Sequence, residues 1–196
     1  KINNDQWKKL KELAESLKTI ANSNKDQKVK KLIELVKMWT EEGLNPIIYC
    51  RYINTAKYVG EHLGNTFGKK SGFGVLTITS EDPDELRKQK VEGMDKYAHR
   101  ILVATDCMSE GINLQENFTA VVHYDLPWNP NRLEQREGRV DRFGQNAKEV
   151  KTALLYAKNS PMDGILLNVL IKKAREIKRS IGISVPFPEN NQSIIE

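Results

Sequence analysis

The stretch Arg100-Ile101-Leu102-Val103-Ala104-Thr105 holds four consecutive apolar residues and shows no alternation of polar and apolar positions. A strand that is covered on both faces has this pattern, whereas a half-exposed strand alternates. Four further runs of the same kind occur along the chain, at residues 46–50, 73–79, 118–124 and 150–156. The sequence therefore predicts five buried strands.

Helical patterns separate these strands. They lie at residues 55–63, 83–97 and 130–142, and three helix starts combine a capping residue with a following proline, at Asp82-Pro83, Asn129-Pro130 and Ser160-Pro161. Repeated strand–helix order predicts an α/β fold, a doubly wound parallel sheet with helices on both faces. In such sheets, ligands meet the loops at the carboxyl ends of the strands.

The chain is expected to divide into three parts. Residues 1–43 form an N-terminal helical segment of two helices, broken at Asn22-Ser23-Asn24, and residues 44–158 form the α/β domain. Residues 159–196 form an extension with a basic helix and a loose tail.

An unusual charge pattern occupies the segment Leu133-Glu-Gln-Arg-Glu-Gly-Arg-Val-Asp-Arg-Phe-Gly-Gln145. On a helix, four arginines fall within about 120° of one face: Arg132, Arg136, Arg139 and Arg142. Residues three or four apart in this segment carry like charges, and Gly138 costs roughly 1 kcal/mol of helix stability relative to alanine. The arginine row therefore needs an external partner.

Two kinds of partner suit these arginines. A guanidinium fork matches phosphate oxygens, which favours a polyphosphate ligand. Carboxylates of neighbouring elements are the other choice, because structural ion pairs are common. Charge geometry alone leaves both open, and the order of the motifs decides between them.

The spacing Gln135-x-x-Gly-Arg-x-x-Arg-x-Gly-Gln145 resembles the last conserved motif of superfamily-two helicases and translocases, in the form found in Swi/Snf-type double-stranded DNA translocases. Residues 104–114, Ala-Thr-Asp-Cys-Met-Ser-Glu-Gly-Ile-Asn-Leu, resemble the preceding motif, and residues 125–130, Asp-Leu-Pro-Trp-Asn-Pro, resemble the segment between them. The resemblance spans about residues 44–158 and is nearest to the bacterial RNA-polymerase-associated ATPase branch. It implies a RecA-like lobe.

The resemblance also implies roles for individual residues. Catalytic roles would fall to Arg139 and Arg142, as arginine fingers, and to Gln135; nucleotide contacts to Glu110, Gly111 and Asn113; and nucleic-acid contacts to Arg51, Thr79, Thr105, Asn129 and Arg136. Asp106 and Glu110 depart from the pattern, because they place two acids in a loop expected to run near DNA.

Two parts of an ATPase site are missing from the sequence. No stretch fits the phosphate cradle Gly-x-x-x-x-Gly-Lys-Ser/Thr, and no Asp-Glu box ends an apolar strand. In the family both belong to the first lobe, so ATP and Mg²⁺ would be held mainly there. This lobe alone is therefore expected not to hydrolyse ATP.

Composition is consistent with a globular protein that binds a polyanion. The net charge is +5 with 39% hydrophobic residues, and Cys50 and Cys107 form neither a CxxC pair nor a metal site with the scattered histidines. The resemblance implies double-stranded DNA and the first lobe as partners, with RNA polymerase or another protein as a further partner, in the bacterial cytoplasm and away from membranes. Two alternatives stay open: a non-catalytic docking module, and a lobe of an RNA or single-strand helicase.

Overall fold

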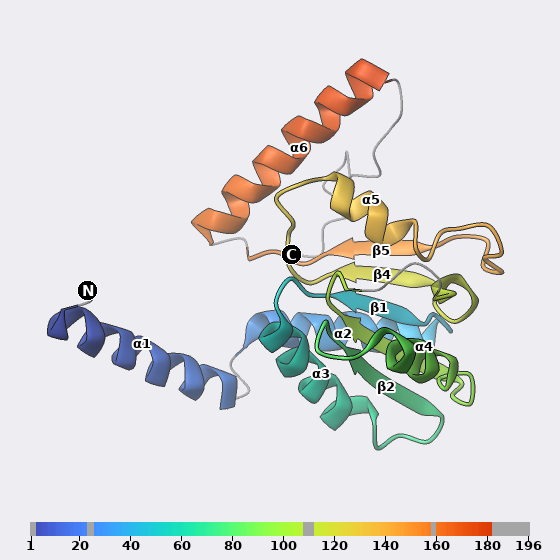
Figure 1. The fold of residues 1–196 in the computed structure, drawn as a ribbon, viewed down its shortest axis with the longest axis horizontal. Helices are drawn as coiled ribbons and strands as arrows, with labels where there is room; N and C mark the ends of the chain where they lie inside the picture. The colour runs from blue at the N-terminus through green and yellow to red at the C-terminus, as the bar shows by residue number, and fades with distance from the viewer. Residues whose placement is uncertain (1–2, 23–25, 108–111, 158–159, 182–196) are drawn as a thin grey trace.

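The computed structural model describes residues 3–22, 26–107, 112–157 and 160–181 (Figure 1). Within them five strands form one parallel sheet in the order β2-β3-β1-β4-β5. The strands are β1 (Pro46–Tyr49), β2 (Phe73–Ile78), β3 (His99–Ala104), β4 (Ala120–His123) and β5 (Lys151–Leu154). The predicted α/β fold with a parallel sheet is confirmed, and every strand lies within two residues of its predicted bounds.

Each face of the sheet is buried under a separate apolar cluster. On one face α2 (Gln27–Glu41) and α3 (Ile53–Phe67) pack through residues such as Leu32, Trp39 and Leu63. On the other face α4 (Asp84–Glu92) and the short helix η1 (Leu114–Glu116) pack on the strands together with Val140. Burial on both sides explains why the strands are apolar without alternation.

Two long helices lie at the two ends of the described chain. The first, α1 (Asn4–Asn22), extends away from the sheet in Figure 1, and its described side chains are exposed. The last, α6 (Pro161–Ile181), packs Leu166 and Leu170 against Leu126. The three-part division of the chain stays a prediction, although α2 is part of the core. The predicted loose tail lies outside the described residues, and so do Ser23 and Asn24.

Two helices are shorter than predicted. The helix expected over residues 130–142 is α5 (Asn131–Glu137), which ends before Gly138, so the predicted end at residue 142 is wrong. Beyond α5 the chain turns, and the Val140 N–H donates to the Glu137 carbonyl at 2.8 Å. The helix expected over residues 83–97 is α4, which ends at Glu92 before Gly93. Glycine follows the last residue of both helices, and in α5 the like charges also oppose a longer helix.

The predicted helix caps differ in outcome. Ser160 is confirmed, since its hydroxyl accepts a hydrogen bond from the Asp163 N–H at 3.3 Å. The Asn129 side chain accepts one from the N–H of Asn131, the first residue of α5, at 3.1 Å. Asp82 does not cap α4; its carboxylate instead accepts from the Thr79 N–H at 2.9 Å and from Lys90 at 2.6 Å. No helix in the described part of the chain is long and apolar enough to cross a membrane.

Candidate functional site

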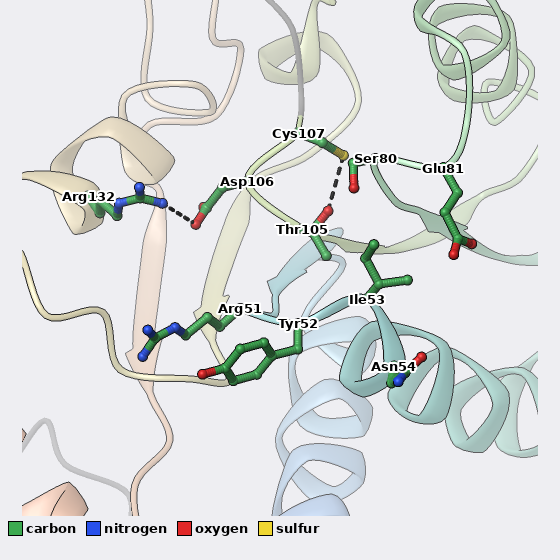
Figure 2. A pocket seen from close by; sticks show the side chains of 10 residues that line it. All are labelled: Arg51, Tyr52, Ile53, Asn54, Ser80, Glu81, Thr105, Asp106, Cys107 and Arg132. Carbon is green, nitrogen blue, oxygen red and sulfur yellow. Dashed lines mark hydrogen bonds and ion pairs between the residues drawn. The ribbon is translucent and has the colours of Figure 1, made fainter. Parts of the chain in front are cut away.

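A cavity of about 720 Å³ lies at the carboxyl edge of the sheet (Figure 2). Because the strands are parallel, the residues that follow β1, β2 and β3 meet there, and Arg51 and Thr105 are among its lining residues. Thr79 reaches the same edge but is buried, and its hydroxyl accepts a hydrogen bond from the Glu81 N–H at 3.3 Å. The next residue, Ser80, lines the cavity in its place.

A second cavity, of about 220 Å³, lies between this edge and the start of α5. It brings together three residues predicted to contact nucleic acid, Arg51, Asn129 and Arg136, and it is also lined by Trp128. Trp128 is 46% exposed, so its indole is available to a ligand or a neighbouring lobe.

Two arginines of α5 bind one carboxylate at the end of β3. Arg136 donates from Nε to Asp106 Oδ1 at 2.6 Å and from Nη2 to Oδ2 at 3.0 Å, which is a bidentate pair. Arg132 donates to the same Oδ2 at 2.9 Å, as Figure 2 shows. Burial raises the pKa of Asp106, but the hydrogen bonds and charges of both arginines outweigh it and hold the pKa below its usual range.

The two arginines differ in exposure. The Arg136 side chain is 3% exposed, whereas that of Arg132 is 56% exposed. The interpretation that pairs the arginine row with a neighbouring carboxylate therefore holds for Arg132 and Arg136. In the sequence, Asp106 stands out only as a departure from the family pattern. The like charges at residues 132–142 were the signal that these arginines need a carboxylate partner elsewhere in the fold.

A buried histidine extends this network. His123 Nε2 lies 3.0 Å from Glu137 Oε1, and His123 Nδ1 lies 3.5 Å from Nη1 of Arg136. Burial lowers the pKa of His123 despite the nearby Glu137 carboxylate. A neutral ring fits both neighbours, because Nε2–H then donates to Glu137 while the lone pair of Nδ1 faces the arginine.

Acid pH is expected to weaken the fold through His123. Its folded pKa is below the value of 6.5 for a free side chain, so below that pH the unfolded chain takes up a proton that the folded chain does not. This contribution to stability is fully present above pH 6.5 and is lost as the pH falls from there through the folded pKa. Imidazole resonances followed by NMR test this, and a His123 ring that titrates at 6.5 or above contradicts it.

A third cavity, of about 180 Å³, lies along α5 and the turn that follows it. Gln135 and Arg139, two of the residues predicted to be catalytic, line it together with Tyr49. Arg142, the third, is exposed in the turn beyond, outside these three cavities. Asn113 is also exposed, and its amide donates to Glu116 at 2.9 Å. Glu110 and Gly111 lie outside the described residues.

The Asp106–Arg132 pair is common to all three cavities. Residues that follow β1, β2 and β3 and residues of α5 and the turn after it thus line three cavities that share this pair. A negatively charged ligand would meet guanidinium groups there, whereas the Thr105 hydroxyl is buried and donates to Cys107 Sγ at 3.2 Å (Figure 2). The roles of individual residues in these cavities stay predictions.

Comparison with known proteins identifies the family. Residues 27–144 match the family described as the helicase conserved C-terminal domain. The Bacillus subtilis protein named uncharacterized ATP-dependent helicase YqhH is 40% identical over 83 residues, 42% of this chain and 14% of that protein. The RNA polymerase-associated protein RapA of Pectobacterium atrosepticum is 45% identical over 62 residues, which are 31% of this chain and 6% of that protein. The DEAD-box ATP-dependent RNA helicase 21 of Oryza sativa subsp. japonica is 28% identical over 143 residues, 72% and 18%.

Solved structures share the fold. The C-terminal part of the Fun30 ATPase domain superposes with a TM-score of 0.62 at 22% identity, covering 73% of this chain and 44% of that one. Domain 2 of the DEAD-box helicase Mss116p, bound to an RNA duplex, superposes with a TM-score of 0.57 at 21% identity, covering 80% and 55%. The chain spans less than a fifth of the curated relatives named above. Since the family match covers more than half of its residues, the chain belongs to the helicase conserved C-terminal domain family of superfamily two, the family of ATP-dependent helicases.

Proposed function

We propose that this chain is the C-terminal motor lobe of an ATP-dependent translocase that moves along double-stranded DNA. ATP and its Mg²⁺ are held mainly by a first lobe, and this lobe completes the site when the two close. The observation that supports the proposal is that the cavity lined by Thr105 and the cavity lined by Arg139, the predicted finger, share the Asp106–Arg132 pair.

The nucleotide side of the site is the cavity with Gln135 and Arg139. An arginine finger stabilises the charge that develops on the transferred phosphoryl group, and such fingers are worth about 10³–10⁵ in rate in other nucleotide hydrolases. Arg142 is exposed in the turn after α5 and acts as the second finger once the first lobe approaches. Gln135 orients the terminal phosphate.

The nucleic-acid side comprises the two cavities at the sheet edge. Arg51, Thr105 and Asn129 supply guanidinium, hydroxyl and amide groups, which are the usual partners of backbone phosphates. Arg136 lines the same region, and its bond to Asp106 connects α5 to the end of β3. Because the Asp106–Arg132 pair lines all three cavities, bound nucleic acid and bound nucleotide would both lie beside it.

A lobe of an RNA helicase is the second candidate. It is favoured by the Oryza sativa RNA helicase, whose similarity covers 72% of this chain. Double-stranded DNA is preferred because the ending Arg142-Phe143-Gly144-Gln145 and the segment at 125–130 resemble those of duplex translocases. A docking module for RNA polymerase or another protein is a third possibility, and it predicts binding without ATP turnover.

Nucleic-acid stimulation distinguishes these functions. In the full-length protein that carries this lobe, we expect duplex DNA to raise ATP hydrolysis several-fold more than single-stranded DNA or duplex RNA, and this lobe alone to be inactive. The measurement is steady-state phosphate release at matched nucleotide concentration and fixed salt, since phosphate contacts make affinity depend on salt. Stronger stimulation by RNA supports the second candidate, and DNA binding without turnover supports the docking module.

A further inference from the structure

The hydroxyl of Tyr49 is buried without a hydrogen-bond partner among the residues that the structure describes. Tyr49 is the last residue of β1 and is 1% exposed. Nearly all buried polar groups in folded proteins are paired, so an unpaired hydroxyl at this position requires an explanation.

This hydroxyl belongs to a residue that lines the third cavity, of about 180 Å³, with Gln135 and Arg139. A water molecule takes roughly 30 Å³ in the liquid, so the cavity has room for a group of a few heavy atoms and its solvent. Three arginines and one aspartate line it, which leaves a formal charge of +2, three minus one.

The chemistry of the lining selects the ligand. A guanidinium has only donors, and burial raises the pKa of Tyr49 above its usual range, so the phenol keeps its proton and acts as a donor as well. The Asp106 carboxylate, the acidic group in the lining, is already bonded to Arg132 and Arg136. A ligand that satisfies this cavity must bring negative charge and several acceptor oxygens.

We propose that this cavity is an oxyanion site for a phosphoryl group and that the Tyr49 hydroxyl donates a hydrogen bond to one of its oxygens. The group is either the terminal phosphoryl of a bound nucleotide or free inorganic phosphate. The proposal rests on the proposed function, because it places the phosphoryl group beside Arg139. Tyr49 thereby joins Gln135 and Arg139 as a third contact to the same group.

The surroundings hold the Tyr49 hydroxyl ready for this bond. The ring lies under the Arg136 guanidinium, whose central carbon is 5.3 Å from the ring centroid. It is anchored on a central strand of the sheet, in register with Ala104 and His123. A donor held in place by the surrounding fold needs no reorganisation when charge develops on its acceptor, and this makes it more effective than the same donor in water.

Replacing Tyr49 by phenylalanine separates this role from a structural one. In the 196-residue chain we expect Y49F to raise the melting temperature by about 2–4 °C, because it removes an unpaired buried hydroxyl. Inorganic phosphate is expected to raise the melting temperature of the wild-type chain above that in chloride of equal ionic strength, and to do so less in Y49F. The matched control is Y58F, since the Tyr58 hydroxyl donates to Asp26 at 3.1 Å. It loses a bond that is made, melts lower, and keeps the full phosphate response.

Turnover of the full-length protein identifies the source of the phosphoryl group. A hydrogen bond to a charged acceptor is worth roughly tenfold or more, so Y49F is expected to lower kcat/KM for ATP by about that factor. Lowered turnover without a phosphate response assigns the site to the nucleotide, and a lost phosphate response with normal turnover assigns it to free phosphate. If Y49F changes neither, or lowers the melting temperature as Y58F does, the proposal is overturned. Normal turnover in R139A overturns the finger assignment instead, and the phosphate response of Tyr49 stays measurable there.

Discussion

Replacing Arg139 by alanine in the full-length protein is expected to lower ATP turnover by about 10³-fold or more, because an arginine finger contributes about that factor to phosphoryl transfer. Arg139 lies two residues beyond the end of α5, after Gly138, and lines the third cavity beside Gln135. Its contribution arises mainly in the transition state, so kcat falls while the KM for ATP changes little. Duplex DNA affinity is expected to stay near that of the wild type, since Arg139 does not line the two cavities proposed to contact DNA.

The conservative variant sharpens this test. Arg139→Lys keeps the positive charge but loses the planar fork, so it is expected to recover only part of the rate. Single-turnover phosphate release reports the chemical step, and thermal melting shows whether each variant is folded. Turnover within a few-fold of the wild type in a folded R139A protein would remove Arg139 from the catalytic machinery and favour the docking-module function.

The parallel sheet, and the meeting of certain residues at its carboxyl edge, could be predicted from the local sequence. Each strand, such as residues 100–105, is a short apolar run, and strand–helix alternation leaves few topologies for a parallel sheet. Once the strands are parallel, Arg51 and Thr105 must meet at the same edge, and they do so around the first cavity.

The site's internal bonds were not predictable from the sequence. A single helix over residues 130–142 would put four arginines on one face, but α5 ends before Gly138 and directs Arg139 and Arg142 into a turn. Asp106 and Arg136 are 30 residues apart, and nothing local says that the first will bind the second. The unpaired hydroxyl of Tyr49 is likewise visible only when its neighbours in space are known.

The Asp106–Arg136 pair is expected to have the largest effect on stability. Asp106→Ala leaves the guanidinium of Arg136 buried, 3% exposed, without its carboxylate, and removing one partner of such a pair costs about 3–5 kcal/mol. Arg132→Ala removes a bond to the same Asp106 from a side chain that is 56% exposed, where solvent screens the charge. Its cost is expected to be at most about 1 kcal/mol, which makes it the matched control. Urea denaturation of the 196-residue chain gives both free energies of unfolding.

A double replacement shows whether the cost of Asp106→Ala comes from the unpaired charge. Asp106→Ala combined with Arg136→Met removes both charges and keeps apolar volume, so it is expected to be more stable than Asp106→Ala alone. The pH dependence provides a second check. The folded pKa of Asp106 is below the unfolded value of 3.8, so the contribution of the pair is fully present above that pH and is lost as the pH falls through the folded pKa. The stabilities of the wild type and the Asp106→Ala variant therefore converge in acid. An Asp106→Ala chain as stable as the Arg132→Ala chain would mean that Arg136 is held mainly by its contacts to His123 and Tyr49.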